Sequence, residues 1–370
     1  MTATFAVIAG GGTAGHVTPG LAIGRALVAR GHEPASLHYV GSERGIETRL
    51  VPEAGFPLTV LPGRGIQRRL TLENVGAAAG LSRAVARALA LLRRLRPRVV
   101  VSVGGFASAP CALAAATLRI PIVVHEQNAV PGAANRLIGP RAKVCAVSYP
   151  GTALPRAIVT GNPVRPEVAA VDRARDGRDA RQALGLPGSE EGSVVAVFGG
   201  SLGALRLNRA VLGALPVWAE RPDLTIYHVV GERDWSLVQS ELGGAAPANY
   251  RHVRYEDRMP LLLGAADLFV CRAGGNTVAE LTAVGAPAVL VPLPGAPGDH
   301  QTANARVLAD AGAAVLVPDA DLDGAQMVAE VDRLLGDPDR LAAMGQAAAG
   351  LARPNAAADI AALVDEHARG

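Results

Sequence analysis

Three glycine-rich segments of this 370-residue chain have the residue types and spacing of phosphate-binding loops. They are GGGTAGH at 10–16, GGSLG at 199–203 and RAGGNTVAE at 272–280. Each follows a short apolar run and opens a helical pattern, so backbone N–H groups at a helix N-terminus can hold negative charge. The Walker pattern G-x-x-x-x-G-K-[ST] does not occur. We therefore expect a nucleotide diphosphate held by backbone amides rather than ATP hydrolysis.

The first loop also contains the pattern G-x-G-x-x-G, which is typical of dinucleotide-binding domains. In those domains an acidic residue closes the second strand, where it binds the ribose. Here the apolar run 36–40 ends in Gly41 and Ser42, and Glu43 comes late. The pattern alone is weak, and an NAD-dependent oxidoreductase stays as an alternative from another functional class.

The second loop matches G-x-S-x-G, the nucleophile elbow of α/β-hydrolases. A hydrolase needs a later acid and a later histidine at strand ends. However, Asp267 begins a strand, and His300 follows a loop rich in proline and glycine. We interpret Ser201 as a phosphate-binding hydroxyl, with a catalytic triad as the alternative.

The third loop carries an acid close to the expected start of its helix. Thr277 and Glu280 have the spacing of a capping box, so Glu280 either caps the helix or accepts hydrogen bonds from sugar hydroxyls. Both interpretations place an anion site at the helix N-terminus.

Short apolar strands alternate with helical patterns along the chain, which predicts an α/β fold with parallel sheets covered on both faces. The pattern breaks at 162–166, where two prolines occur, and at 172–192, which we interpret as a solvated connection. It then restarts with a second strand, glycine loop and helix. Strands are expected at 5–9, 36–40, 99–103, 122–124, 144–147, 157–160, 194–198, 225–230, 268–271, 288–291 and 314–317. Helices are expected at 16–30, 73–95, 109–118, 132–138, 204–215, 277–284, 302–309, 325–335 and along an alanine-rich C-terminal run.

Composition narrows the functional class. Apolar residues make up 49% of the chain and the net charge is +3, which gives no indication of a nucleic-acid partner. Cys111, Cys145 and Cys271 lie far apart in apolar runs, so we expect buried thiols in a reducing compartment. The N-terminus lacks the features of a signal peptide, and no apolar run approaches the ~20 residues of a membrane span. We expect a soluble or peripheral protein.

Seven motifs in order resemble the MurG family of bacterial N-acetylglucosaminyltransferases, which use UDP-GlcNAc and lipid I, the undecaprenyl-pyrophosphoryl-MurNAc-pentapeptide. The resemblance covers nearly the whole chain and implies a GT-B fold, in which two Rossmann-like domains have parallel sheets facing across a cleft. It implies an N-terminal acceptor- and membrane-binding domain at 1–163, with a C-terminal helix at about 345–370 packing back on it. A UDP-GlcNAc-binding domain would span 164–344. The motifs are GGTAGH with PGL at 11–21, GGFASAP at 104–110, HEQN at 125–128, GNPVR at 161–165, GGSLGA at 199–204, GGNTVAE at 274–280 and DHQTANA at 299–305.

The resemblance also implies roles for individual residues. Thr13, Ala14 and Gly15 would lie by the donor, and Asn128 and Arg165 would contact the nucleotide sugar from the side of the first domain. The expected contacts of the second domain are Ser201 with the diphosphate, Glu280 with the ribose, Gln301 with the sugar, the backbone at Glu256 with uracil, and Gly275, Asn276, Thr277, Val278 and Ala279 along the third loop.

Two positions depart from the family pattern. Ala14 stands where glycine is usual, and its methyl would narrow the approach to phosphate and disfavour positive φ. Phe106 replaces the usual tyrosine, so a hydroxyl role is absent there.

The implied reaction is displacement at the anomeric carbon of UDP-GlcNAc by the C4 hydroxyl of MurNAc, with inversion. His16 is our candidate base, because histidine titrates near neutrality and the positive helix terminus disfavours the imidazolium form. The alternative is that His16 binds a phosphate or caps the helix. His125 and Glu126 are further candidates for the base or for acceptor binding. No Asp-x-Asp motif occurs and H-E-x-x-N is not the zinc motif, so we expect no metal and no cofactor.

The segment 64–98 contains nine arginines and one acid, Glu73, separated by leucine and valine. A basic, partly apolar helix is typical of membrane-surface binding, and the alternative is a solvated face above a core-facing leucine stripe. With a lipid-linked acceptor, we expect an anionic membrane surface as a partner and a peripheral location on the cytoplasmic face of the cell membrane. Remaining alternatives are a glycolipid glycosyltransferase, a UDP-GlcNAc 2-epimerase and a non-catalytic sugar-nucleotide-binding module.

Overall fold

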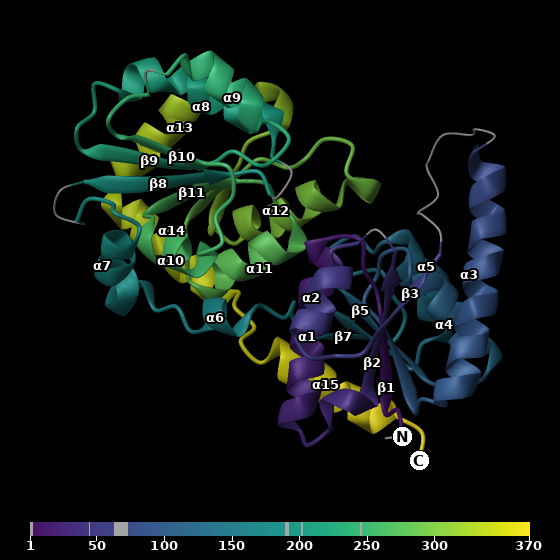
Figure 1. Cartoon of the computed structure of the whole chain (residues 1–370). Helices are drawn as coiled ribbons and strands as arrows, with labels where there is room; N and C mark the ends of the chain where they lie inside the picture. The colour runs from purple at the N-terminus through teal and green to yellow at the C-terminus, as the bar shows by residue number, and fades with distance from the viewer. Residues whose placement is uncertain (1–2, 44, 63–72, 189–191, 201–202, 245) are drawn as a thin grey trace. The chain divides into compact units, whose positions relative to one another are not determined.

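The computed structural model describes residues 3–43, 45–62, 73–188, 192–200, 203–244 and 246–370 (Figure 1). The chain divides into two compact units, Met1–Arg165 with Arg353–Gly370, and Pro166–Ala352. Each unit is built on one parallel sheet with helices on both faces. From the sequence, the C-terminal segment that packs on the first unit is expected to begin at about 345. In the structure this segment begins at Arg353, because Met344 packs into the core of the second unit.

The first unit contains a seven-stranded sheet in the order β3-β2-β1-β4-β5-β6-β7. Successive residues of β1 alternate between two cores, as the two-residue period of a strand requires: Val7 and Ala9 face one side, Ala6 and Ile8 the other. The strands are β1 Ala6–Ala9, β2 Leu37–Ser42, β3 Leu58–Leu61, β4 Val99–Ser102, β5 Ile122–Glu126, β6 Val144–Val147 and β7 Ala157–Val159.

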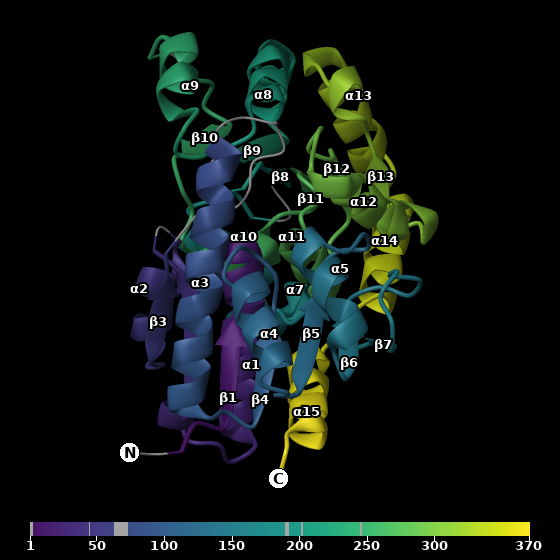
Figure 2. The ribbon, with the colours of Figure 1, turned by 90° about the vertical axis from the view of Figure 1, so that its right-hand side faces the viewer.

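Helices α3 and α4 cover one face of this sheet, and α1 and α15 pack together on the other (Figures 1 and 2). Asp365 of α15 holds the end of α1 through Arg30 (Nε–Oδ2 2.6 Å) and His32 (Nε2–Oδ1 2.7 Å). The helices are α1 Ala14–Ala29, η1 Pro34–Ser36, α2 Glu47–Glu53, α3 Glu73–Leu95, α4 Ser108–Thr117, α5 Ala133–Ile138, η2 Gly139–Arg141 and α15 Ala356–His367.

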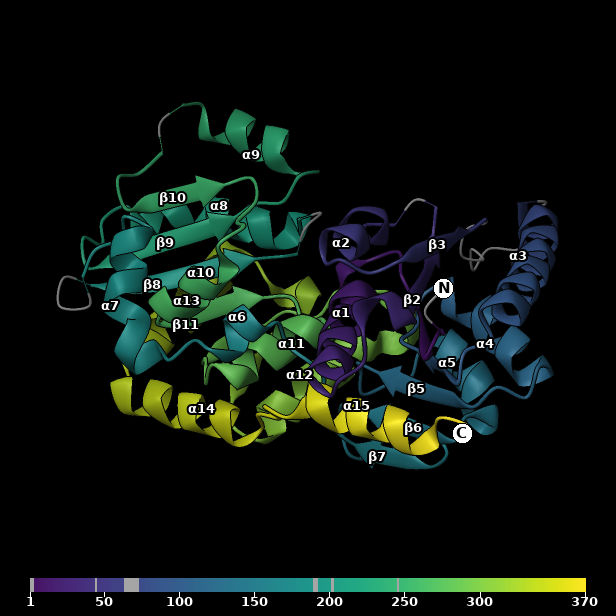
Figure 3. The ribbon, with the colours of Figure 1, turned by 60° about the horizontal axis from the view of Figure 1, so that its bottom comes forward.

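The second unit contains a six-stranded parallel sheet in the order β10-β9-β8-β11-β12-β13, part of which is visible in Figure 3. Its strands are β8 Ser193–Phe198, β9 Leu224–Val229, β10 Tyr250–Val253, β11 Leu268–Cys271, β12 Ala288–Leu290 and β13 Ala314–Leu316. Its helices are α6 Pro166–Ala169, α7 Arg173–Ala183, α8 Leu205–Trp218, α9 Trp235–Leu242, α10 Met259–Ala265, α11 Gly275–Ala283, η3 Pro297–Asp299, α12 His300–Asp310, η4 Asp319–Asp321, α13 Gly324–Leu335 and α14 Pro338–Gly350.

The interpretation of 172–192 as a solvated connection was wrong for its first half. Asp172 caps α7 by accepting hydrogen bonds from the N–H groups of the next turn, and α7 packs against α10. The side chain of Arg181 on α7 is buried and pairs with Asp267 (Nη2–Oδ2 2.6 Å). Although α7 is highly charged, this ion pair with a residue distant in the sequence fixes it to the rest of the second unit.

Candidate functional site

The carboxyl ends of β1, β4 and β5 carry the loops of the first unit that the sequence singles out. The loop after β1 begins α1, with Thr13 as its N-cap, and Gly12 adopts φ +94°. Gly105, in the loop after β4, has φ +80°, and a β-carbon there would overlap the carbonyl oxygen of Gly11. The two glycine loops therefore pack directly on each other.

His16 lies in the first turn of α1 and is half-buried. Its Nδ1 is 3.3 Å from the hydroxyl oxygen of Thr13. Gly104 adopts φ +88°, and a β-carbon there would lie 3.0 Å from His16 Nε2, so only glycine accommodates the ring in this position. Ala14 begins α1 with helical backbone, so its methyl carries none of the strain expected from positive φ.

Glu126, at the end of β5, organises the loop that follows. It is buried, and its carboxylate accepts hydrogen bonds from the backbone N–H groups of Asn128 (3.0 Å) and Gly132 (2.9 Å) and from Asn135 Nδ2 (2.9 Å). Asn128 is half-buried at the rim of this loop. Because its carboxylate is used within the protein, Glu126 fits a positioning role better than the role of a base.

His125 is fully buried. Its Nδ1 lies 3.2 Å from the carbonyl oxygen of Ala146, and its Nε2 lies 3.2 Å from Asn162 Oδ1. Burial lowers the pKa of His125 below its ordinary value, against opposing effects of Asn162, Glu126 and Ala146. A neutral ring enclosed in this way has no access to a substrate hydroxyl, so the structure does not support His125 as a base.

In the second unit, the loop after β8 leads into α8, whose N-cap is Ala204 and has no side-chain cap. Gly200 and Gly203 adopt φ +99° and +90°. Ser201 lies outside the described residues. The described part of the loop lines a cavity of about 760 Å³ together with Gln301 and four arginines, Arg206, Arg209, Arg233 and Arg272. Two acids, Asp319 and Asp323, line the same cavity, and Asp319 pairs with Arg206 and Arg272. The arginines of the lining still outnumber its acids, so the net charge of the lining is positive.

Two of the residues around this cavity are fixed by contacts that the sequence did not reveal. The carbonyl of Gln301 accepts a hydrogen bond from Leu293 N (2.9 Å), which leaves its NH2 group to serve as a donor. Arg272 is buried and pairs with Asp319 (Nη1–Oδ1 2.6 Å), while its buried Nε has no hydrogen-bond partner among the described residues. In the sequence, Arg272 stands out only as the first residue of the third loop.

The third loop forms the N-terminus of α11, whose N-cap is Gly274. Thr277 is the third residue of the helix and Glu280 the sixth, so the capping-box interpretation of Glu280 was wrong. Gly275 and Val278 are buried, whereas Asn276, Thr277, Ala279 and Glu280 are half-buried. The carboxylate of Glu280 is thus held beside a helix terminus that it does not cap.

Glu256 follows β10 and is buried. Its carboxylate accepts hydrogen bonds from the hydroxyl of Tyr227 and from the N–H of Arg258 (2.8 Å). Burial raises the pKa of Glu256, but these hydrogen bonds outweigh it, and the pKa lies below its ordinary value. Burial and the carboxylate together raise the pKa of Tyr227 to about 12. The side chain of Glu256 is therefore engaged within the protein, where it fixes the loop.

Behind the second glycine loop lies a buried polar chain that the sequence did not reveal. His228 contacts Tyr250 Oη through Nδ1 (2.8 Å) and Asn208 Oδ1 through Nε2 (2.9 Å). Asn208 donates onward to Asp234 (3.0 Å), whose carboxylate lies beside Gly203. Burial, with a smaller effect of His252, lowers the pKa of His228 to about 3, so the ring is neutral.

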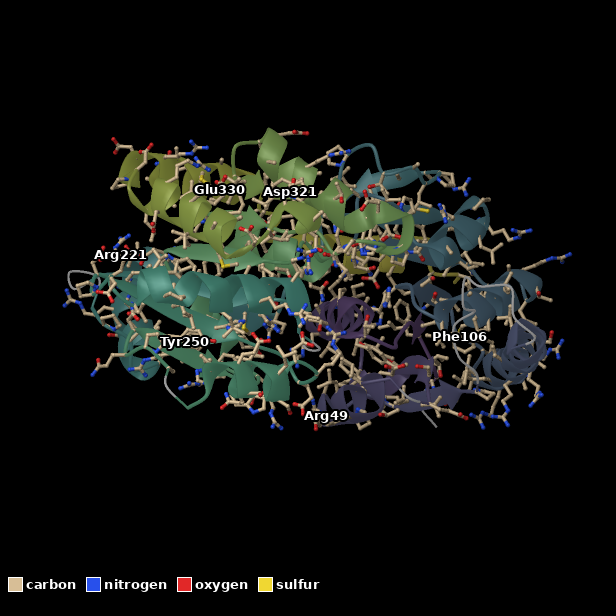
Figure 4. The ribbon with its side chains drawn as sticks, turned by 90° about the horizontal axis from the view of Figure 1, so that it is seen from above. Arg49, Phe106, Arg221, Tyr250, Asp321 and Glu330 are labelled. Atoms are coloured by element: carbon tan, nitrogen blue, oxygen red, sulfur yellow. The ribbon has the colours of Figure 1, made fainter. Side chains whose placement is uncertain are left out.

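Phe106 and Arg165 are the remaining two positions that the sequence singles out. Phe106 packs partly buried against the core of the first unit, and Figure 4 labels it there. Its ring therefore has a packing role. Arg165, the last residue of the first unit, is half-buried.

Comparisons with known proteins cover both units. A family model described as the glycosyltransferase family 28 N-terminal domain matches residues 6–147, and one described as the C-terminal domain matches residues 194–362. A relative from Desulforudis audaxviator is 41% identical over 370 residues, covering 97% of each chain. One from Nocardioides sp. is 43% identical, again covering 97% of each chain. Both are named UDP-N-acetylglucosamine--N-acetylmuramyl-(pentapeptide) pyrophosphoryl-undecaprenol N-acetylglucosamine transferase.

Solved structures are also similar to this chain. The crystal structure of Acinetobacter baumannii MurG superimposes with a TM-score of 0.76 at 29% identity, covering 98% of this chain and 99% of that one. A UDP-GlcNAc 2-epimerase from Neisseria meningitidis has a TM-score of 0.67 at 13% identity, covering 98% and 99%, which shows a shared fold alone. The chain therefore has the GT-B fold and belongs to glycosyltransferase family 28 and, within it, to the MurG family.

Proposed function

We propose that this enzyme transfers N-acetylglucosamine from UDP-GlcNAc to the C4 hydroxyl of MurNAc in lipid I, giving lipid II for peptidoglycan synthesis. The observation that carries the proposal is full-length similarity above 40% to relatives named for this reaction. The arginine-lined cavity beside the second glycine loop supports it, because a UDP-sugar donor brings a diphosphate.

In this mechanism the C4 oxygen attacks the anomeric carbon of the donor, the bond from that carbon to the β-phosphate oxygen breaks, and UDP leaves with the electron pair. His16 accepts the hydroxyl proton. The uncapped N-termini of α8 and α11, with the cavity arginines, stabilise the negative charge on the leaving diphosphate. An α-linked donor then gives a β-1,4 product with inversion. No metal and no cofactor is required in this scheme.

The remaining substrate contacts are part of the same proposal. Thr13, Ala14 and Gly15 lie at the exposed start of α1, and the proposal places them by the donor sugar with Asn128 and Arg165. Ser201 and residues 275–279 contact the diphosphate, Glu280 the ribose, Gln301 the sugar hydroxyls, and the backbone at Glu256 the uracil.

We expect the purified protein to convert UDP-GlcNAc and a lipid I analogue to lipid II and UDP, with no turnover when either substrate is omitted. Radiolabel transfer measures the product, and proton NMR of UDP-GlcNAc alone detects epimerisation. Titration calorimetry should detect UDP binding and no NADH binding. Absence of UDP binding, or conversion of UDP-GlcNAc without acceptor, would contradict the proposal.

We also propose that the first unit binds the anionic cytoplasmic face of the cell membrane as a peripheral protein. In the described part of α3, Ala84, Ala88, Leu91 and Leu92 pack into the core, so the leucine stripe is core-facing, as the alternative interpretation had it. The exposed arginines, Arg83, Arg87, Arg93 and Arg94, support the proposal instead. Beyond α4 lies a groove of about 700 Å³ with three cations, Arg119, Arg141 and Lys143, and no acid. No described helix is long and apolar enough to span a bilayer.

Reversing two charges, Arg83→Glu with Arg87→Glu, should weaken binding to phosphatidylglycerol-containing vesicles by about 30-fold or more, from ~1 kcal/mol per arginine near an anionic surface. Vesicle sedimentation measures the affinity. The matched control is Arg178→Glu with Arg340→Glu, two exposed arginines of the second unit, which should bind as the wild type does. Equal affinity of both double variants would exclude the membrane role of α3.

A further inference from the structure

The carboxylate of Glu47, at the start of α2, is buried behind the first glycine loop. Both of its oxygens accept from the N–H of Gly12, at 3.1 Å and 2.9 Å. Oε1 also accepts from the N–H of Ser42 (2.7 Å) and from its hydroxyl (2.8 Å). One side chain therefore joins the loop after β1 to the end of β2, and Glu47 lies 35 residues from Gly12 in the sequence.

Three glycines make room for this carboxylate. A β-carbon at Gly11, Gly41 or Gly45 would overlap the side chain of Glu47. Gly11 and Gly41 have backbone conformations open to any residue, so their lack of a side chain is explained by space and not by φ. The surroundings are shaped around a carboxylate at this position.

The loop held by Glu47 is the one that positions His16. Gly12, whose N–H the carboxylate binds, is followed at once by Thr13, the N-cap of α1 and the contact of His16 Nδ1. His16 and Glu47 line the same small cavity, along with Tyr39. The N–H of Gly12 is committed to the protein, so it does not serve a phosphate.

We propose that Glu47 is a positioning residue for the transfer reaction, acting through the Gly12 loop on the imidazole of His16. This inference rests on the proposed function, in which His16 accepts the proton of the acceptor hydroxyl. Glu47 touches no substrate. It fixes where α1 begins, and with it the Thr13–His16 contact that decides which ring nitrogen carries the proton.

The direct test is Glu47→Gln, which keeps the shape but points an amide N–H at the N–H of Gly12. We expect kcat to fall by about 10-fold to 100-fold, as for misplacement of a reacting group by a fraction of an ångström to 1 Å, with the Kd for UDP unchanged. The ¹⁵N shifts of the His16 ring should also change. Glu53→Gln is the control on the same helix: Glu53 is exposed and pairs with Arg49, labelled in Figure 4.

A second test displaces the carboxylate without removing it. The methyl of Gly41→Ala would overlap the side chain of Glu47 and displace its carboxylate. Because this displacement would move His16 indirectly, kcat should fall at least 10-fold. In the double variant Gly41→Ala with Glu47→Ala, the side chain that the methyl would overlap is absent. The kcat of the double variant should therefore be no lower than that of Glu47→Ala alone. Wild-type kcat in folded Glu47→Gln, or additive losses in the double variant, would overturn the proposal. Failure of the wild type to transfer would instead overturn the function itself.

Discussion

Replacing His16 by alanine is expected to lower kcat by about 10²–10⁴-fold, the usual contribution of a general base. The ring lies in the first turn of α1, and a general base at this place would accept the proton of the acceptor hydroxyl. If Nδ1–H donates to the hydroxyl of Thr13, the ring nitrogen that can accept a proton is Nε2, beside Gly104. Initial rates at saturating UDP-GlcNAc and lipid I analogue measure the loss.

The Kd of this variant for UDP should be nearly that of the wild type, because the contacts proposed for the diphosphate, the ribose and the uracil belong to the second unit. His38→Ala is a matched control. His38 is a half-buried histidine of the first unit that contacts Thr59 (Nε2–Oγ1 2.8 Å), and its loss should leave kcat unchanged. If His16→Ala kept the wild-type rate, the imidazole would not be the base. If it mainly weakened donor binding, the phosphate-binding alternative would be favoured.

Sequence pattern predicted the architecture because the central strands are buried on both faces and therefore form short apolar runs. Strands such as β8 and β11 were predicted nearly to their ends. The edge strands β3 and β10 were missed. β10 reads Tyr-Arg-His-Val and pairs with β9 alone, so only part of it is buried and its apolar signal is weak.

The glycine loops of the candidate site were also predictable, because glycine at a strand–helix junction has a local physical reason. The groups that fix those loops were not. Glu47 holds Gly12 from 35 residues away, and Asn208 reaches Asp234 from 26 residues away. A single sequence shows which residues can carry charge but not which distant backbone groups they bind. The same limit explains why the buried His125 resembled an accessible base.

Replacing Glu280 by alanine is expected to weaken UDP binding by about 10-fold to 100-fold, since a hydrogen bond to a charged group contributes ~1.5–3 kcal/mol. Asn276 and Thr277 precede Glu280 by four and three residues, so all three share one face of α11 at its N-terminal end. Since Gly274 is the N-cap, the carboxylate is not needed to begin the helix. Its proposed partners are the ribose hydroxyls, which titration calorimetry with UDP tests directly.

At saturating donor, kcat of the Glu280→Ala variant should stay close to that of the wild type, because the ribose is bound equally in the ground state and the transition state. Glu220→Ala is the control, since Glu220 is exposed just beyond the far end of α8. A fall in kcat with unchanged Kd for UDP would contradict the ribose role, because a lost ground-state contact cannot act only on turnover. It would instead place the carboxylate near the reacting sugar, where charge develops as the bond to UDP breaks.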